Sequence, residues 1–198
     1  MFDIISCDTW GLGYEYRDGY SSVKKWIIEE TEPYITEITA TMSDINVNMR
    51  YRKEYSYNDR CIILGLRGAS SSNPFNFQCY FRNGTVNPSI MLNSETNDNT
   101  FYGCKQNTND YLYFTYNSDN AYFIGKYNIS DNTITNLHMN LHKDKFNIVI
   151  NNINNKIIIT AYFDNAYDKS FPKVNYILEN DNLYYLNNMP AYRYQYNS

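Results

Sequence analysis

Polar and apolar residues alternate along much of this sequence, and this alternation constrains the fold more than any other feature does. Between residues 45 and 53, Ile45, Val47 and Met49 fall on one face of an extended chain, with asparagine and arginine on the other. Short strands at regular spacing predict a mainly β fold: a single antiparallel β-sandwich domain over residues 1–198 with one or two short helices. Further strands are expected near residues 2–9, 34–42, 60–66, 75–81, 110–116, 121–128, 133–141, 146–151, 156–163, 174–179, 182–187 and 191–196.

Asparagine marks the expected turns between these strands. The segments Asn151–Asn155 and Asn180–Asn182 separate apolar runs, as the turns of β-hairpins do. Asparagine tolerates a positive φ and hydrogen-bonds its own backbone, so it can replace glycine, of which the chain has only 8. The sequence shows no evident internal repeat with a period of about 20 to 50 residues.

One helix is expected near residues 21–31. Val23, Trp26 and Ile27 follow the i, i+3, i+4 spacing of an apolar helix face, a serine precedes them as an N-cap, and Pro33 would end the helix. The lysines at its start and the glutamates at its end oppose the helix dipole, so packing of Trp26 has to hold it in place.

Three segments are expected to lie outside regular structure. Residues 93–109 are rich in asparagine and poor in apolar residues, which predicts one long loop. Residues 65–74 predict a second loop, and residues 10–14 a turn after the first strand.

Composition excludes some classes of partner. Lys and Arg total 17 against 21 Asp and Glu, which gives a net charge of -4 and argues against binding nucleic acid or an anionic membrane through bulk charge. The start of the sequence lacks a basic, apolar leader, and no apolar run approaches the length of about 18 residues that a membrane span needs. These features predict a soluble intracellular protein.

The sequence offers no motif that identifies an enzyme. The four cysteines have no metal-site spacing and are expected to be buried or half-buried free thiols. His138 and His142 are four residues apart, but only Asp144 lies nearby as a third ligand, so no metal site is expected. The dinucleotide, P-loop and G-x-S-x-G patterns are absent. We therefore expect a protein that is not an enzyme, with no catalytic residues and no required cofactor.

Tyrosine is the most unusual component of the sequence, with 22 residues beside 30 asparagines. Many tyrosines are spaced i, i+2, so a strand would present them on one face, and tyrosine is favoured at protein interfaces. A phenol is neutral at pH 7 and charged above about pH 10, so tyrosine-lined contacts would separate in alkali. The candidate interface phenols that would act as this pH trigger are Tyr14, Tyr16, Tyr111, Tyr113, Tyr192, Tyr194 and Tyr196.

In these tyrosine clusters, the opening of Asp3 to Glu30 and the β-rich remainder, the chain resembles the polyhedrins of insect cypoviruses. The resemblance is one of overall character and rests on no shared motif. It implies a structural protein whose β-sandwich trimers self-assemble in the host cytoplasm into a crystalline viral occlusion body. Such a body protects virions as cargo, is found outside the cell after release, and dissolves at alkaline pH. Some members bind nucleotides in the crystal, but no residue here is assigned to a nucleotide.

Two alternatives remain at this point. The first is a binding module, lectin-like or engaged in virus–host contacts, in which Trp10, Trp26 and exposed tyrosines serve as stacking surfaces and asparagines as polar partners. The second is a hydrolase whose site is scattered along the chain.

Overall fold

The computed structural model describes residues 2–15, 24–38, 55–66, 76–88, 90–91, 101–118, 121–142, 146–163 and 174–186. Within these ranges the regular structure is entirely β. The strands are β1 (Phe2–Ser6), β2 (Trp10–Glu15), β3 (Lys24–Glu29), β4 (Ile35–Ile38), β5 (Tyr55–Tyr57), β6 (Cys61–Leu66), β7 (Asn76–Phe81), β8 (Ile90–Met91), β9 (Phe101–Tyr102), β10 (Tyr111–Ser118), β11 (Ala121–Asn128), β12 (Thr133–His142), β13 (Phe146–Ile153), β14 (Lys156–Phe163), β15 (Val174–Glu179) and β16 (Asn182–Leu186).

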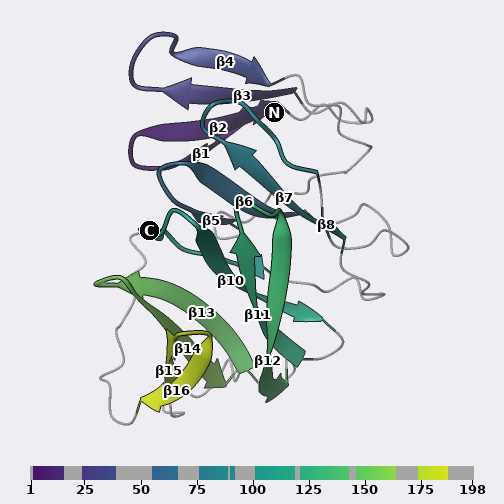
Figure 1. Ribbon diagram of the computed structural model, residues 1–198, viewed down its shortest axis with the longest axis vertical. Coiled ribbons are helices and arrows are strands. Elements are labelled where there is room, and N and C mark those ends of the chain that lie inside the picture. The colour runs from purple at the N-terminus through teal and green to yellow at the C-terminus, as the bar shows by residue number, and fades with distance from the viewer. Residues whose placement is uncertain are drawn as a thin grey trace.

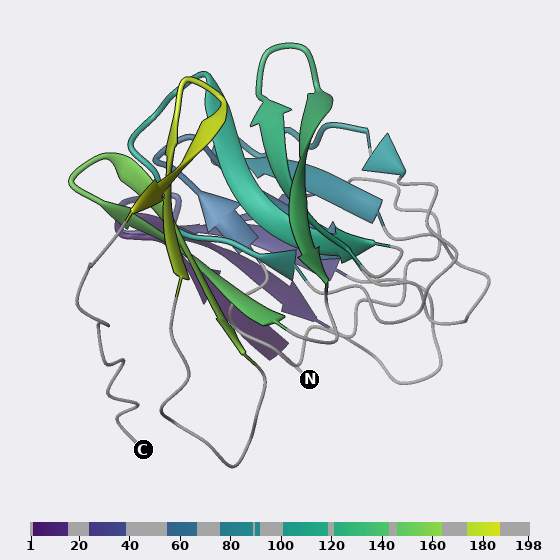
Figure 2. The same ribbon diagram turned by 90° about the horizontal axis from the view of Figure 1, so that it is seen from below.

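The strands form four sheets, and each sheet is an antiparallel meander of four strands that are consecutive in sequence. The first sheet holds β1–β4, the second β5–β8, the third β9–β12 and the fourth β13–β16. Figure 1 shows the sheets following one another in chain order, from the first at the top to the fourth at the bottom, and Figure 2 shows the same stack from below.

Three apolar clusters join the sheets in pairs. Trp10, Leu12 and Ile27 of the first sheet pack with Ile62 and Leu64 of the second. A separate cluster joins the second sheet to the third, and another joins the third to the fourth. Because a strand directs successive side chains to opposite faces, a sheet inside the stack needs apolar residues on both faces.

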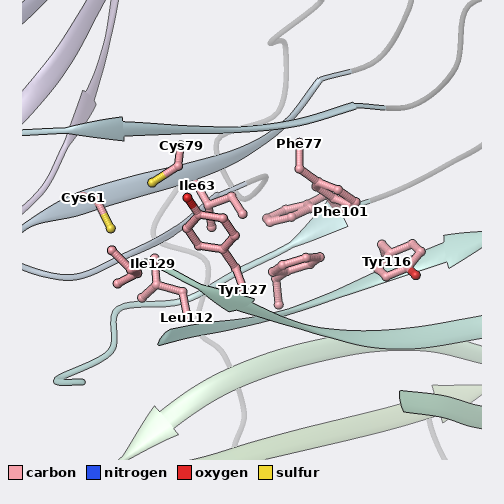
Figure 3. Close-up of a cluster of buried hydrophobic side chains, with 10 residues drawn as sticks. Cys61, Ile63, Phe77, Cys79, Phe101, Leu112, Tyr116, Tyr127 and Ile129 are labelled. Carbon is pink, nitrogen blue, oxygen red and sulfur yellow. The ribbon is translucent and has the colours of Figure 1, made fainter. Parts of the chain in front are cut away.

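Strand β6 meets this requirement at consecutive positions. Ile62 and Leu64 face the first sheet, whereas Cys61 and Ile63 face the third, and all four are buried. The junction between the second and third sheets is largely aromatic (Figure 3). There Phe101 stacks on Phe114, with ring centroids 4.7 Å apart. Such ring pairs contribute about 0.5–1.5 kcal/mol each beyond the burial of their surface.

The mainly β fold built from antiparallel sheets packed face to face is confirmed, with four layers in the stack. The asparagine turns are confirmed as well: Asn154 and Asn155 have φ of 51° and 63°, and Asn180 and Asp181 have 49° and 62°. The expected strands over residues 45–53 and 191–196 lie outside the described residues. The expectation of a single domain over residues 1–198 stays a prediction.

The expected helix near residues 21–31 is wrong for the part that the structure describes. Residues 24–29 form β3, which pairs with β2 on one side and β4 on the other. Trp26 and Ile28 lie on one face of this strand and Ile27 on the other, so the apolar run reflects a strand with two apolar faces. The two sheet ladders satisfy the backbone of β3, and the charges that oppose a helix dipole carry no such cost in a strand.

Two other expectations are corrected. Residues 10–14 lie within β2, where pairing with both β1 and β3 overrides the turn tendency of two glycines. The predicted loop over residues 93–109 is wrong at residues 101–102, which form β9 with Phe101 buried. Residues 103–109 are irregular as expected, apart from a bridge of Lys105 to Tyr57. Residues 92–100 and 67–75 lie outside the described residues.

A repeat is present that the sequence did not reveal. The four meanders begin at Phe2, Tyr55, Phe101 and Phe146, so one supersecondary unit recurs four times. Each copy meets a different neighbour, and its buried residues differ accordingly, which hides the repeat in the sequence.

Substitution of Gly125 tests the packing of the aromatic junction between the second and third sheets. Gly125 lies directly opposite Phe114, and a Cβ atom added there would lie 2.2 Å from the Phe114 ring. We expect Gly125→Ala to lower the free energy of unfolding by about 2–3 kcal/mol, because the ring has to move within a filled core. Urea unfolding measures this loss.

The matched variant is Gly125→Ala combined with Phe114→Leu. If the clash with the ring is the cause, alanine costs at least about 1 kcal/mol less in the leucine background. Equal costs in the two backgrounds would contradict this explanation.

Candidate functional site at the junction of the third and fourth sheets

The structure brings together two of the seven tyrosines that the sequence singled out. Tyr111 and Tyr113 lie on the same face of β10, with ring centroids 5.1 Å apart, and both pack toward the fourth sheet. Tyr14 belongs to β2, but its side chain is not described. Tyr16, Tyr192, Tyr194 and Tyr196 lie outside the described residues.

Tyr111 and Tyr113 meet two charged residues, Lys126 and Asp181, and we call these four residues the tyrosine–aspartate cluster. The Tyr113 hydroxyl donates a 2.6 Å hydrogen bond to Asp181 Oδ1. Lys126 Nζ lies 2.9 and 2.7 Å from the two Asp181 oxygens and 4.6 Å from the centroid of the Tyr111 ring. The ammonium group therefore combines an ion pair with a cation–π contact.

Local structure explains why these groups meet. Tyr113 and Lys126 are directly opposite each other in the β10–β11 ladder. Asp181 is the second residue of the two-residue turn between β15 and β16, where it adopts a positive φ that aspartate tolerates. This turn brings its carboxylate to the two central strands of the third sheet, β10 and β11.

The charges of the cluster are well defined at neutral pH. Hydrogen bonds from Lys126 and Tyr113 lower the pKa of Asp181, which is therefore a carboxylate. Burial raises the pKa of Tyr113, and the hydrogen bond to the Asp181 carboxylate raises it further, so the phenol stays protonated. Ionising Tyr113 in the folded protein would place two anions in contact.

The backbone of Tyr113 is held by Ser56 of the second sheet and by Gln106, which lies between β9 and β10. The Ser56 hydroxyl of β5 donates to the Tyr113 carbonyl at 2.6 Å. The Gln106 amide group donates to the same carbonyl at 2.5 Å and accepts from the Tyr113 N–H at 2.8 Å. Ser56 and Gln106 are buried, so these bonds are shielded from water. Tyr113 thus connects the second, third and fourth sheets.

Polar contacts also connect the other sheet junctions. Arg82 donates to both carboxylate oxygens of Glu29, at 2.7 and 2.6 Å, and so joins the second sheet to the first. Asn87 donates to the Tyr127 hydroxyl at 2.7 Å between the second and third sheets. Lys105 and Asp8 form a further ion pair between the third sheet and the first.

The cysteines behave as the sequence suggested and offer little nucleophilic chemistry. All four are free, with Cys61 and Cys79 buried and the other two half-buried. Burial raises the pKa of Cys7 and of Cys104 to about 12 and also raises that of Cys79. These three thiols are protonated at neutral pH, and a thiol is a weak nucleophile compared with a thiolate.

Sequence reasoning found part of this site. The i, i+2 spacing predicted that Tyr111 and Tyr113 share a face, and the asparagine turn marked the position next to Asp181. No local signal pointed to Ser56, which lies 57 residues from its partner. Lys126 lies 55 residues from Asp181 and was missed for the same reason. Gln106 lies only 7 residues from Tyr113, but within the segment that the sequence predicted to be a loop.

Neither a metal-ligating group nor a helix that could span a membrane is found in the described ranges. They contain no group of three or more His, Cys, Asp or Glu side chains arranged to hold a metal ion. They also contain no helical segment with the length and apolar character needed to cross a bilayer. The side chains of His138 and His142 are not among those described.

The sequence matches no protein-family model and has no significant match among curated proteins.

The tyrosine–aspartate cluster should affect the stability of the fold at alkaline pH. Because the folded-state pKa of Tyr113 is raised, the phenol stabilises the fold below about pH 10, and this stabilisation is lost as the pH rises toward the folded-state value. Tyr113→Phe should cost about 1–2 kcal/mol at pH 7.5 through the lost hydrogen bond. It should also reduce the fall in stability above pH 10 by about 1.4 kcal/mol per pH unit.

Urea unfolding at several pH values between 7.5 and 11.5 tests both effects. Tyr34→Phe is the control, because this ring is 56% exposed, and it should retain the wild-type pH dependence. A Tyr113→Phe protein that loses stability in alkali as steeply as the wild type would show that this phenol is not a source of the effect.

Proposed function

We propose that this protein is a non-catalytic binding module that recognises a protein partner through the outer face of its first sheet. The supporting observation is that β3 carries apolar residues on both faces. Ile27 packs against the second sheet, while Trp26 and Ile28 lie on the opposite face. The outermost sheet of a stack normally presents polar residues to solvent, so apolar residues on its outer face indicate a binding surface.

The neighbouring strand extends this surface. Ile35 of β4 lies directly opposite Ile28, on the same face of the sheet, and is 61% exposed. We call Trp26, Ile28 and Ile35 the first-sheet patch. Tryptophan and aliphatic side chains close together favour protein contacts, because they bury a large apolar area.

The stacked repeat supports the same function. Repeated supersecondary units held by their neighbours form rigid scaffolds whose surfaces serve recognition. In this protein polar contacts at each junction, such as Glu29–Arg82 and Asp181–Lys126, fix adjacent sheets relative to one another. A binding surface on such a scaffold loses little conformational freedom when a partner docks.

Selection from a displayed library of random peptides tests this proposal. Peptides selected on the purified chain should bind the wild type and lose affinity at least about tenfold for Ile28→Ser/Ile35→Ser, a loss of about 1.4 kcal/mol. Thr135→Ser/Asn136→Ser, at exposed positions of β12, is the matched control and should bind like the wild type.

Two outcomes would count against the proposal. Selected peptides whose binding does not depend on the first-sheet patch would exclude it as the recognition surface. Patch-dependent binding to a glycan array, with no peptide selected, would favour the lectin-like alternative.

We propose, as a second candidate, a structural protein that self-assembles into a viral occlusion body and dissolves in alkali. The specific observation in its favour is the number of buried phenols and thiols. Burial raises the pKa of Tyr116 to about 12 and raises the pKa of Tyr113 and Tyr127 as well. Each group stabilises the fold below about pH 10 and loses that contribution as the pH rises toward its folded-state pKa. Above pH 10 each subunit of such an assembly would lose folding stability, and the assembly would dissolve.

Expression of the chain alone in insect cells tests this second candidate. Micrometre-scale intracellular crystals are expected, and the turbidity of the insoluble fraction should fall sharply above about pH 10. A fully soluble product without a transition in alkali would exclude assembly and leave the binding module.

A further inference from the structure

Strand β16 is the open edge of the fourth sheet. It pairs with β15 on one side, and among the described residues no strand pairs with it on the other. Its five residues, Asn182–Leu186, include no charged residue and no proline. Edge strands are normally protected by charge, proline or a bulge, because their free backbone groups can pair with another strand.

The hairpin turn determines which backbone groups are free. In a two-residue turn the N–H of Asn182 bonds to the carbonyl of Glu179, so Asn182 directs its backbone groups toward β15. In an antiparallel ladder this direction alternates, so Tyr184 also points inward. Leu183 and Tyr185 therefore direct their N–H and C=O groups to the open edge.

The side chains of β16 leave this edge accessible. Tyr184 is 51% exposed and Tyr185 is 59% exposed, and they lie on opposite faces of the strand. The Tyr185 ring packs at an angle against Tyr176, with centroids 6.0 Å apart, so it stands beside the edge without blocking it.

We propose that β16 pairs with β16 of a second copy of this chain, in an antiparallel register centred on Tyr184. In this register Leu183 of one copy lies opposite Tyr185 of the other. Both residues have outward backbone groups, so the two symmetry-related pairs provide four hydrogen bonds between the copies. The fourth sheets then join into one continuous sheet of eight strands.

The side chains fit a two-fold axis through this centre. Tyr184 meets its own copy at a position without hydrogen bonds, where the strands approach most closely and side-chain pairs interact best. Leu183 meets Tyr185 on the other face, which makes an aromatic–aliphatic pair. Such an interface is isologous, because the same strand contributes to both sides, and it closes as a dimer.

Self-pairing carries no electrostatic cost at β16. A second copy places no like charges opposite each other along this strand, which is neutral throughout. The charged residues of the preceding strand end and turn are paired within the chain, Glu179 with Lys156 and Asp181 with Lys126. By comparison, the edge strand β4 carries Glu37, which would face a like charge in any two-fold pairing centred near it. This inference does not depend on the proposed function, because the first-sheet patch lies on another sheet.

Substitutions of opposite charge at Tyr184 test the register of the proposed strand pairing. The wild-type chain should sediment as a dimer, whereas Tyr184→Lys and Tyr184→Glu should each weaken dimerisation at least about tenfold, because each places like charges opposite each other. Mixing the two variants should restore a dimer that contains one copy of each. Thr135→Lys, at an exposed position of the edge strand β12 of the third sheet, is the control and should remain dimeric.

Tyr185→Pro tests the backbone bonds. Proline removes an N–H that points to the open edge, so it should abolish dimerisation and leave the β15–β16 ladder intact. Tyr185→Thr keeps the N–H and favours a strand, so it should retain a dimer, and circular dichroism verifies that both variants are folded. A monomeric wild type, a dimer that survives Tyr185→Pro, or lysine and glutamate variants that do not pair with each other would each overturn the proposal.

Discussion

The burial of both faces of the second and third sheets is the constraint on which the rest of this structure depends. Neighbouring residues such as Cys61 and Ile62 enter different apolar clusters, so a shift in register by one residue would exchange two distinct junctions. Some positions in these junctions also require a side chain that is apolar over most of its length and carries a polar group at its tip. Tyr113 and Tyr127 meet this need, because each fills a cluster with its ring and reaches a polar partner with its hydroxyl. Much of the tyrosine content is therefore used inside the stack.

Strands with clear alternation and asparagine turns were predictable from the sequence. In the fourth sheet, β14 and β15 have the expected bounds, and β16 ends one residue earlier than expected. Local rules suffice there, because each hairpin closes through two residues that tolerate a positive φ, as Asn154 and Asn155 do.

Elements that depend on distant partners were not predictable. The apolar residues of β3 match the spacing of a helix, and only pairing with β2 and β4 makes this segment a strand. The two residues of β9 pair with β10, and Phe101 packs beside Phe77 between the second and third sheets, which no local pattern signals. The tyrosine–aspartate cluster joins residues 68 positions apart, and alternation along one strand says nothing about which turn it will meet.

Each apolar cluster joins only consecutive sheets, and this gives the molecule the character of a short linear array. Apolar packing therefore couples the first and fourth sheets only through the two sheets between them, and the Lys105–Asp8 ion pair adds a polar contact from the third sheet to the first. The fourth sheet is bounded by one apolar junction, so its opening breaks fewer contacts than the opening of an internal sheet. Amide hydrogen exchange should then be graded along the stack, with strongest protection in β6 and β10 and earlier exchange toward the terminal sheet.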